Sequence, residues 1–221
     1  MVIQTRARTP ESKLERRGRI LDEALTLWQE RRYPDVTLAD IAARVGLTKP
    51  ALFAYFATKE ELFLSLYERL LGEWFDALDR HLRLGGTHTP PSLATLLATL
   101  ITERPALARL IPLLAGLLEH NVSATRAAEH KTWVASRLAV TAPLLEAALP
   151  GLPGGSGPAL LTYTQALVAG LQPLSEPSPA VREALATTGL GALHVDFAAA
   201  LRESLTALLR GMVQTTEEGD R

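Results

Sequence analysis

Hydrophobic residues in the first third of the chain recur every three or four positions, which is the spacing of one face of an α-helix. The pattern appears in three stretches: Ile20, Leu21, Ala24, Leu25 and Trp28; Leu38, Ile41, Ala42 and Val45; and Leu62, Leu66, Leu70 and Trp74. Each stretch predicts a helix that buries one face. The turn residues Tyr33, Pro34 and Asp35 separate the first from the second.

Capping residues mark both ends of the short second helix. Thr37 precedes it and Asp40 follows three residues later. At this spacing, the two side chains accept hydrogen bonds from backbone N–H groups that have no partner inside the helix. Gly46 is the expected stop, because glycine adopts the positive φ that many helix ends require.

A third short helix, about two turns long, is predicted directly after this turn. Thr48 is the expected N-cap, and Pro50 fits the first turn because the N–H that proline lacks would have no partner there. Thr58 and Glu61 repeat the capping spacing and open a long helix that we expect to reach about Leu84. Two short helices joined by a glycine turn are the layout of a helix-turn-helix that reads DNA.

The rest of the chain also has a helical pattern, with proline and glycine at the breaks. A linker at 85–91 precedes a helix for which Ser92 is the expected cap. This helix should end near Thr102, because Arg104 and Pro105 follow as a break. A turn at 121–123 and a flexible loop at 150–158 separate later helices, expected at 106–121, 123–149, 159–172, 181–188 and 196–213. The prediction is an all-α chain with a three-helix DNA-binding domain at 1–60 and a helical-bundle domain at 61–221.

Composition limits the class of protein. With 221 residues and 47% hydrophobic content, the chain can bury a core. The absence of cysteine excludes disulfides, thiolate zinc sites and a cysteine nucleophile. No apolar stretch reaches the roughly 20 residues of a membrane span, and the first residues lack the apolar core of a secretory signal. We therefore expect a cytoplasmic protein with no membrane contact.

Enzyme signatures are missing from the sequence. We find no nucleophile beside a base, no phosphate-binding glycine loop and no cluster of metal ligands. His120 and His130 lie ten residues apart without a supporting carboxylate pattern. The expectation is a protein without catalytic activity, metal or cofactor.

Charge is distributed unevenly, although the net charge is only −1. Residues 1–69 hold 12 Lys and Arg against 10 Asp and Glu, and the remainder is net acidic. Basic residues crowd the N-terminus, at Arg6, Arg8, Lys13, Arg16, Arg17 and Arg19. Such a segment either reaches phosphates or a minor groove or is a solvated tail, as is common at termini. Both interpretations stay open for Arg6 and Arg8.

The combined spacing of residues 37–62 resembles the DNA-binding domain of the TetR family of one-component bacterial regulators. The matching elements are TLADIA, the VGLTK turn, LFAYF in the recognition helix and TKEEL at the next helix start. Together with the helix that ends near Trp28, the resemblance covers about the first third of the chain. It implies a homodimer that binds a palindromic double-stranded operator and, in the family's usual direction, a repressor released by a small-molecule effector.

In a helix-turn-helix, the recognition helix faces base edges while neighbouring helix starts hold phosphates. Thr37, Thr48 and Lys59 lie at helix starts and are the expected phosphate contacts, with Lys59 as a mobile charge. The expected groove-facing residues are Lys49, Pro50, Ala51, Ala54 and Tyr55, of which Tyr55 resembles a family tyrosine that binds phosphate. Because most of these side chains are short or apolar, DNA shape or the arginine arm is expected to contribute to specificity. Phe56 is expected in the core, and the position of Phe53 is left open.

The resemblance also assigns roles to the later helices. Helices 159–172 and 196–213 correspond to the family's dimerisation bundle, and their leucines and small residues suit close packing. The alternative is that they form only intramolecular core. The middle helices should enclose a mainly apolar site for a hydrophobic or amphipathic effector. Candidate polar groups for that site are Trp74, His120, Asn121, His130, Trp133, Tyr163, Thr164, Gln165 and Gln172.

The leading hypothesis is thus a ligand-responsive transcriptional repressor. The helix from Thr58 to about Leu84 would carry an effector-induced movement to the DNA-binding domain. The alternative is a helical interaction or membrane-surface protein that does not bind specific DNA. That alternative accounts for the later helices but leaves the three caps between 37 and 61 unexplained.

Overall fold

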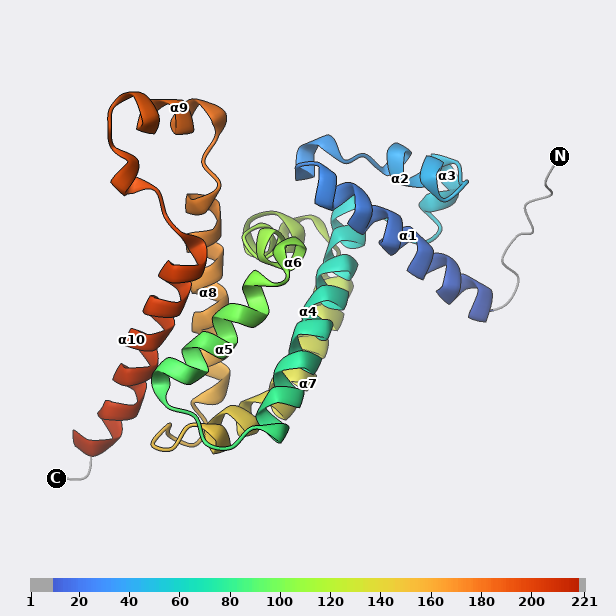
Figure 1. Ribbon diagram of the computed structural model, residues 1–221. Helices are drawn as coiled ribbons and strands as arrows, with labels where there is room; N and C mark the ends of the chain where they lie inside the picture. Colours follow the sequence, from blue (N-terminus) through green and yellow to red (C-terminus); the bar gives the residue numbers. More distant parts are fainter. Residues whose placement is uncertain (1–9, 219–221) are drawn as a thin grey trace.

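The computed structural model describes residues 10–218, and every regular element in that range is helical (Figure 1). Its α-helices are α1 (Pro10–Glu30), α2 (Leu38–Arg44), α3 (Lys49–Leu52), α4 (Lys59–Leu84), α5 (Pro90–Thr102), α6 (Pro105–Leu110), α7 (Ala124–Ala148), α8 (Gly157–Ser175), α9 (Pro179–Thr187) and α10 (Phe197–Glu218). Short 3₁₀ turns lie at Tyr33–Asp35, Glu119–Asn121 and Gly191–Leu193, and a π turn lies at Leu114–Leu118. The all-α fold predicted from the sequence is confirmed.

The turn between α2 and α3 forms through the capping interactions that the sequence predicts. The Thr37 hydroxyl accepts a hydrogen bond from the backbone N–H of Asp40 (3.1 Å), and the Asp40 carboxylate accepts one from the backbone N–H of Thr37 (3.2 Å). After α2, Gly46 has a φ of 68°, and the N–H of Leu47 reaches back to the carbonyl of Ala42 (2.8 Å). This arrangement around a left-handed glycine is a Schellman motif, which satisfies carbonyls at the helix end.

The recognition helix α3 is shorter than predicted. Thr48 caps it by accepting a hydrogen bond from the N–H of Ala51 (3.3 Å), but regular helix ends at Leu52. The N–H groups of Ala54 and Tyr55 donate to carbonyls three residues back, which is the tighter 3₁₀ pattern of a helix end. The prediction of a two-turn helix was therefore wrong in its second turn.

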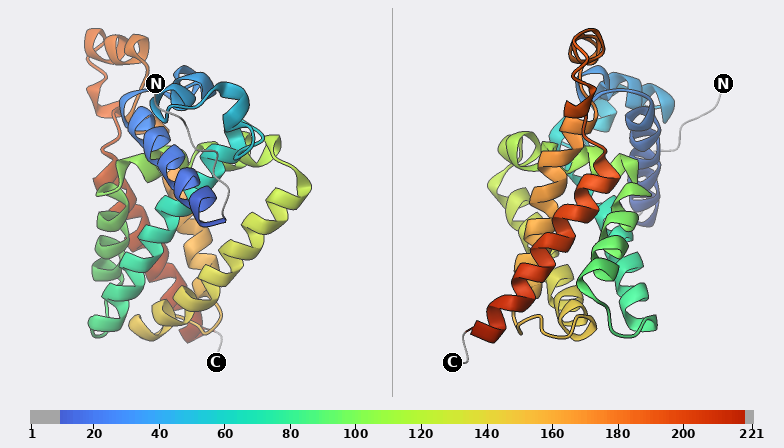
Figure 2. Two further views of the ribbon diagram at one scale, coloured as in Figure 1. Left: turned by 90° about the vertical axis from the view of Figure 1, so that its right-hand side faces the viewer. Right: turned by 60° about the vertical axis from the view of Figure 1, so that its left-hand side comes forward.

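Helix α4 joins the N-terminal helices to the rest of the molecule, and α7 lies alongside it (Figures 1 and 2). The Thr58 hydroxyl caps α4 by accepting from the N–H of Glu61 (3.0 Å), as predicted. Glu68 of α4 pairs with His130 of α7 and, further along both helices, Asp79 pairs with Thr141, so the two helices run in the same direction. Helix α8 packs on α7, and α10 packs on both α5 and α8. Leucines from all of these helices form one continuous core.

A second connection links the N-terminal helices to the core through α1 and α6. The indole N–H of Trp28 donates to the carbonyl of Ala106 (2.9 Å). The guanidinium of Arg109 donates to the carbonyls of Trp28 (3.1 Å) and Arg31 (3.0 Å) and lies over the Trp28 ring. Helix α1 is thus fixed to α6, independently of the path through α4.

Two expected elements differ from the structure. Helix α5 is capped by Thr89, whose hydroxyl accepts from the N–H of Ser92 (3.4 Å), so Ser92 lies inside the helix. The single helix expected at 106–121 is broken after Leu110. Pro112 explains the break, because proline has no N–H and its ring collides with the carbonyl four residues earlier.

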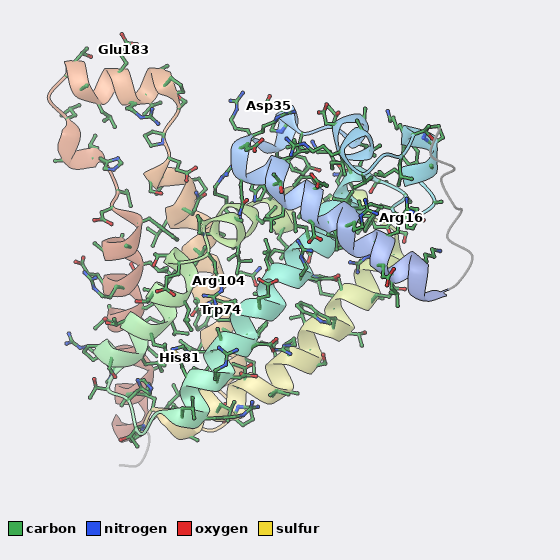
Figure 3. All side chains as sticks on the ribbon, turned by 45° about the vertical axis from the view of Figure 1, so that its right-hand side comes forward. Arg16, Asp35, Trp74, His81, Arg104 and Glu183 are labelled. Carbon is green, nitrogen blue, oxygen red and sulfur yellow. The ribbon has the colours of Figure 1, made fainter. Side chains whose placement is uncertain are left out.

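Between α8 and α10 the chain makes an excursion away from the rest of the molecule. It contains α9, and Figures 1 and 2 show it projecting past the end of α8 and α10. Glu183 lies at its tip (Figure 3). Among the residues that the structure describes, no helix is long and apolar enough to cross a membrane.

Candidate nucleic-acid interface and ligand cavity

The residues around α3 present a small exposed face at one end of the molecule. Lys49, Pro50 and Ala54 are exposed, whereas Ala51 and Tyr55 are half-buried. Phe56 is fully buried, which confirms its assignment to the core, and Phe53 is 45% exposed and so belongs to the surface. The face is short and mostly apolar, as its sequence predicts.

Two residues expected to contact phosphate are already engaged in this structure. The Thr37 hydroxyl donates to the Asp40 carboxylate (2.8 Å), and the Thr37 backbone N–H uses the same carboxylate. The Lys59 ammonium donates to the carbonyl of Tyr33 and lies over its ring, 3.9 Å from the centroid. Burial lowers the pKa of Lys59. Lys59 is therefore not the mobile charge expected from the sequence, because Tyr33 holds it.

The basic N-terminus contributes one residue to the described structure around α3. Arg17, half-buried on α1, donates to the carbonyl of Tyr55 (2.8 Å) and lies 4.1 Å from the centroid of the Phe56 ring. Burial lowers its pKa, while the nearby Glu61 opposes that shift. Arg6 and Arg8 lie outside the described residues.

A cavity of about 100 Å³ lies among α4, α5, α7 and α8. Most of its lining is apolar, and its polar residues come mainly from α7 and α8. The lining residues are Tyr67, Leu71, Trp74, Phe75, Ile101, Ile111, Leu114, His130, Lys131, Val134, Leu138, Leu161, Thr162, Thr164, Gln165 and Val168. Figure 3 shows Trp74 on the side of α4 that faces α5 and α8. The cavity is thus placed where the sequence interpretation expected an effector site.

Four of the nine expected ligand residues line the cavity: Trp74, His130, Thr164 and Gln165. The other five do not line it. His120 and Asn121 are exposed on the turn before α7, where Asn121 donates to the carbonyl of Leu117 (2.8 Å). Trp133 stacks on the His130 ring and lies against α4, and Tyr163 is 48% exposed on the outer side of α8. Gln172, also considered, lines a separate groove near α6 and α10.

Two nitrogen atoms from residues of the cavity wall are buried without a hydrogen-bond partner in the part of the chain that the structure describes. They are Nε2 of His130 and Nε1 of Trp74, whose residues are 1% and 3% exposed. Burying a polar atom without a partner costs free energy. The Thr164 hydroxyl, in contrast, donates to the carbonyl of Leu160 (2.8 Å). The two nitrogens therefore distinguish this cavity from a purely apolar void.

The other ring nitrogen of His130, Nδ1, belongs to a polar cluster that the sequence did not predict. This nitrogen lies 2.9 Å from Oε1 of Glu68, whose Oε2 accepts from Arg126 (2.6 Å). Arg126 also donates to the hydroxyl of Ser65 (3.3 Å). Burial alone would raise the pKa of Glu68, but hydrogen bonds from His130 and Arg126 outweigh it and lower the pKa overall.

Sequence spacing offered a signal for some of the missed residues. Tyr67, Leu71 and Phe75 share the helical face of Trp74, so one candidate on α4 predicts the others. The partners Glu68 and His130 lie 62 positions apart, and no local pattern connects them. Their contact depends on the register of α7 against α4.

Together, the fold and the two sites define a class of protein: a helix-turn-helix regulator whose DNA-binding part is built onto a helical domain with an internal cavity. The chain belongs to the TetR family. The family model described as the tetracyclin repressor-like C-terminal domain matches residues 68–216. The model described as bacterial regulatory proteins of the tetR family matches residues 20–66. The family assignment made from residues 37–62 is confirmed, and the chain is a TetR-family transcriptional regulator.

Curated relatives match over short stretches. The HTH-type transcriptional activator FasR of Mycolicibacterium smegmatis is 38% identical over 55 residues, which are 25% of this chain and 25% of that protein. IcaR of Staphylococcus epidermidis, a negative transcriptional regulator of the biofilm operon icaADBC, is 32% identical over 65 residues, 29% of this chain and 35% of that one. The chain thus spans about a quarter to a third of these relatives, and their names give opposite directions of regulation.

Solved structures share the fold over most of the chain. A TetR transcriptional regulator from a Rhodococcus species has a TM-score of 0.51 at 16% identity, covering 89% of this chain and 95% of that one. FadR of Bacillus subtilis, solved in complex with stearoyl-CoA, has a TM-score of 0.50 at 16% identity, covering 88% and 98%. At this identity the likeness establishes the arrangement of helices only.

Proposed function

We propose that the chain is a ligand-responsive repressor that binds a palindromic operator as a homodimer and releases it when an apolar or amphipathic effector fills the cavity. The observation that carries this proposal is the cavity itself. It lies against α4, the helix that leads directly from the recognition segment into the core. We keep 1–60 and 61–221 as the DNA-binding and effector domains and propose that the protein acts in the cytoplasm.

The exposed face at α3 supports the DNA contact. Lys49, Pro50 and Ala51 are the proposed base-facing residues, and Thr48 and Tyr55 the proposed phosphate contacts. For Thr37 and Lys59 to contact phosphate, DNA must displace their present partners, Asp40 and Tyr33. We also propose that Arg6 and Arg8 contact the DNA. The stable caps of the segment favour binding, because a preformed backbone has less entropy to lose.

Helices α8 and α10 support a dimer. Both place small residues four positions apart on exposed surface: Ala166 and Gly170 on α8, and Ala207 and Gly211 on α10. Small side chains let helices approach closely, and a two-fold axis brings the same patch of each subunit together. Two recognition helices must lie about one DNA turn apart, roughly 34 Å, to read a palindrome. We propose residues 159–172 and 196–213 as the interface.

The small size of the cavity supports release by ligand. Sites for drug-sized ligands usually occupy about 300–1,000 Å³, whereas this cavity measures about 100 Å³. A larger effector must therefore push its walls apart, and α4 and α7 form two of those walls. Because α4 continues into the DNA-binding helices, the same displacement changes the separation of the two recognition helices in a dimer. Inverting a 99:1 population would require about 5.5 kcal/mol of preference for the released state.

The test is selection of bound DNA from a random double-stranded pool with the full chain, followed by binding to the selected site across a salt series. We expect a palindrome with half-sites about 10 base pairs apart centre to centre. The logarithm of the binding constant should fall by about 0.9 per phosphate contact for each tenfold rise in salt. Sedimentation of the same preparation should give a dimer.

Other outcomes would separate the alternatives. A pool without enrichment, or binding that salt does not weaken, would reject the repressor and favour a helical interaction protein. A selected site without symmetry, bound by a monomer, would reject the dimer but keep the DNA-binding function. Tighter operator binding in the presence of effector would reverse the proposed direction of regulation.

A further inference from the structure

We infer that the effector is an apolar alcohol whose hydroxyl meets Nε2 of His130, and that this contact reaches the recognition segment through a chain of hydrogen bonds from His130 to Tyr55. This inference rests on the proposed function, since it names the ligand class and the route of regulation for the same cavity. The proposed route consists of polar contacts that the packing of a helical bundle does not require.

The first link is the imidazole of His130. The Glu68 carboxylate lies at hydrogen-bond distance from Nδ1. Because an ionised carboxylate can only accept hydrogen bonds, Nδ1 carries the proton and donates the hydrogen bond to Glu68. A neutral ring then has a lone pair at Nε2, the atom left without a partner among the described residues. A carboxylate oxygen of Glu119 is 3.6 Å from Nε2, beyond hydrogen-bond range, and is held by Lys131 (2.5 Å).

The atoms around Nε2 favour a hydroxyl group in the ligand. A hydroxyl donates to a lone pair and also accepts from an N–H, so it suits either state of the ring. An ionised acid offers only acceptors and brings a negative charge toward Glu68 and Glu119. Trp74 lies six residues beyond Glu68 on α4, or about 9 Å along the helix. It supplies one further N–H that has no partner among the described residues. An elongated ligand could use it with a second oxygen.

The next links lead from Glu68 to one shared hydroxyl. Glu68 holds Arg126, and Arg126 donates to Oγ of Ser65 (3.3 Å). Arg17 donates to the same oxygen (2.8 Å). The hydroxyl proton of Ser65 goes to the carbonyl of Glu61 (3.0 Å), so both of its lone pairs are taken by guanidinium groups. Two positive groups therefore meet at one small side chain, and the position of one affects the other.

The last link joins Arg17 to the recognition segment. Its second nitrogen donates to the carbonyl of Tyr55 (2.8 Å), and its guanidinium covers the buried Phe56 ring. Arg17 thus fixes the turn that follows α3. When a ligand moves the His130 ring, Glu68 and Arg126 must move with it or lose their hydrogen bonds. Either change alters the contact at Ser65, and with it the hold of Arg17 on Tyr55.

Binding of three matched probes tests the ligand class. Hexanol, hexanoic acid and hexane share an apolar chain and differ in the head group, and binding to the full chain can be followed by tryptophan fluorescence. We expect hexanol to bind about tenfold more tightly than hexane, as one added hydrogen bond provides. His130→Phe should remove that difference. Equal binding of hexanol and hexane, tighter binding of the acid, or no binding of any probe would overturn the ligand class.

Amide hydrogen exchange at residues 49–56 tests the route without DNA, so its failure is distinct from a failure to bind an operator. Saturating hexanol should change exchange there in the wild type, and Glu68→Gln should bind hexanol but lose that response. Asp76→Asn is the matched control, because it removes another α4–α7 ion pair, to Arg137 (2.5 Å), that lies outside the route.

If circular dichroism shows that Glu68→Gln is unfolded, Ser65→Ala provides a milder test. It deletes only the hydroxyl that the two guanidinium groups share, and it should also abolish the response at 49–56. If either folded variant binds hexanol and keeps the wild-type response, the route is wrong. Loss of the response in Asp76→Asn as well would show that general packing of α4 on α7, and not this chain of hydrogen bonds, carries the signal.

Discussion

The helix-turn-helix and the cavity domain are stabilised over very different distances along the chain. Between residues 37 and 61, each helix start is capped by a side chain that binds a backbone group three residues away: Thr37 with Asp40, Thr48 with Ala51, and Thr58 with Glu61. In the cavity domain, polar contacts between α4 and α7 join residues 62 positions apart. Examples are His130 with Glu68 and Thr141 with Asp79.

This difference separates the two parts of a regulator physically. The helix starts of the DNA-binding part are specified by their local sequence. The cavity part depends on how long helices pack, and a ligand that changes the packing changes the polar contacts between them. A local change should therefore stay local in the first region and spread in the second.

The largest effect is expected for Gly157→Ala, at the start of α8. A Cβ at this position would lie 2.7 Å from both the Cβ and the carbonyl oxygen of Ala142, and 2.8 Å from its Cα. Because two of these atoms are backbone, α8 and α7 must separate, and we expect a loss of about 2 kcal/mol in the free energy of unfolding. Urea unfolding followed by circular dichroism measures it.

Gly154→Ala is the matched control in the preceding loop, because a Cβ there would meet no atom of the described residues within 4 Å. Its effect should stay within about 0.5 kcal/mol. The spread of the disturbance is equally diagnostic: in Gly157→Ala, amide exchange should rise in both α7 and α8. Equal stability of the two variants would show that α8 does not pack on α7 at this distance.

Sequence reasoning succeeded where the physical cause was local. The cap at Thr37, the left-handed Gly46 and the start of α4 at Thr58 depend on residues at most a few positions away, and these features are confirmed. The break after Leu110 was also local, since Pro112 marks it, but the apolar run around that proline favoured a continuous helix.

The cavity was less predictable because its lining depends on helix register. Trp74 and His130 were chosen as polar or aromatic residues on apolar helices, and the same rule chose Tyr163, which lies on the outer side of α8. A polar residue on a helix can face a cavity, a neighbour or solvent, and sequence spacing alone does not distinguish them. Ser65, Glu68 and Arg126 become a cluster only when α7 lies beside α4.

A smaller, local effect is expected for Thr37→Ala, which removes the cap of α2. Losing a threonine N-cap costs about 1 kcal/mol. Amide exchange should increase at residues 38–47 and stay unchanged in α7. Thr132→Ala is the control, since Thr132 is an exposed threonine inside α7 whose hydroxyl donates to the carbonyl four residues back. If exchange rose equally in α7, the two regions would not differ in the way proposed.

The smallest effect concerns the pH dependence of the same cap. The pKa of Asp40 is lowered, first by its hydrogen bond from the Thr37 side chain and then by that from the Thr37 backbone. A carboxyl whose pKa is lower in the folded than in the unfolded state stabilises the fold above its unfolded pKa, and this contribution is lost as pH falls through its folded pKa. The stability difference between the wild type and Asp40→Asn should therefore be greatest near neutral pH and shrink toward about pH 3.

Urea midpoints of both proteins across this range provide the measurement, and Thr37→Ala provides the control background. Without the Thr37 hydroxyl, the largest cause of the lowered pKa is gone, so Asp40→Asn should then show a weaker dependence on pH. A difference that stayed constant or grew with acidity in the wild-type background would place the stabilising role of Asp40 in its shape and not in its charge. In that case the capping box would stabilise α2 through geometry alone.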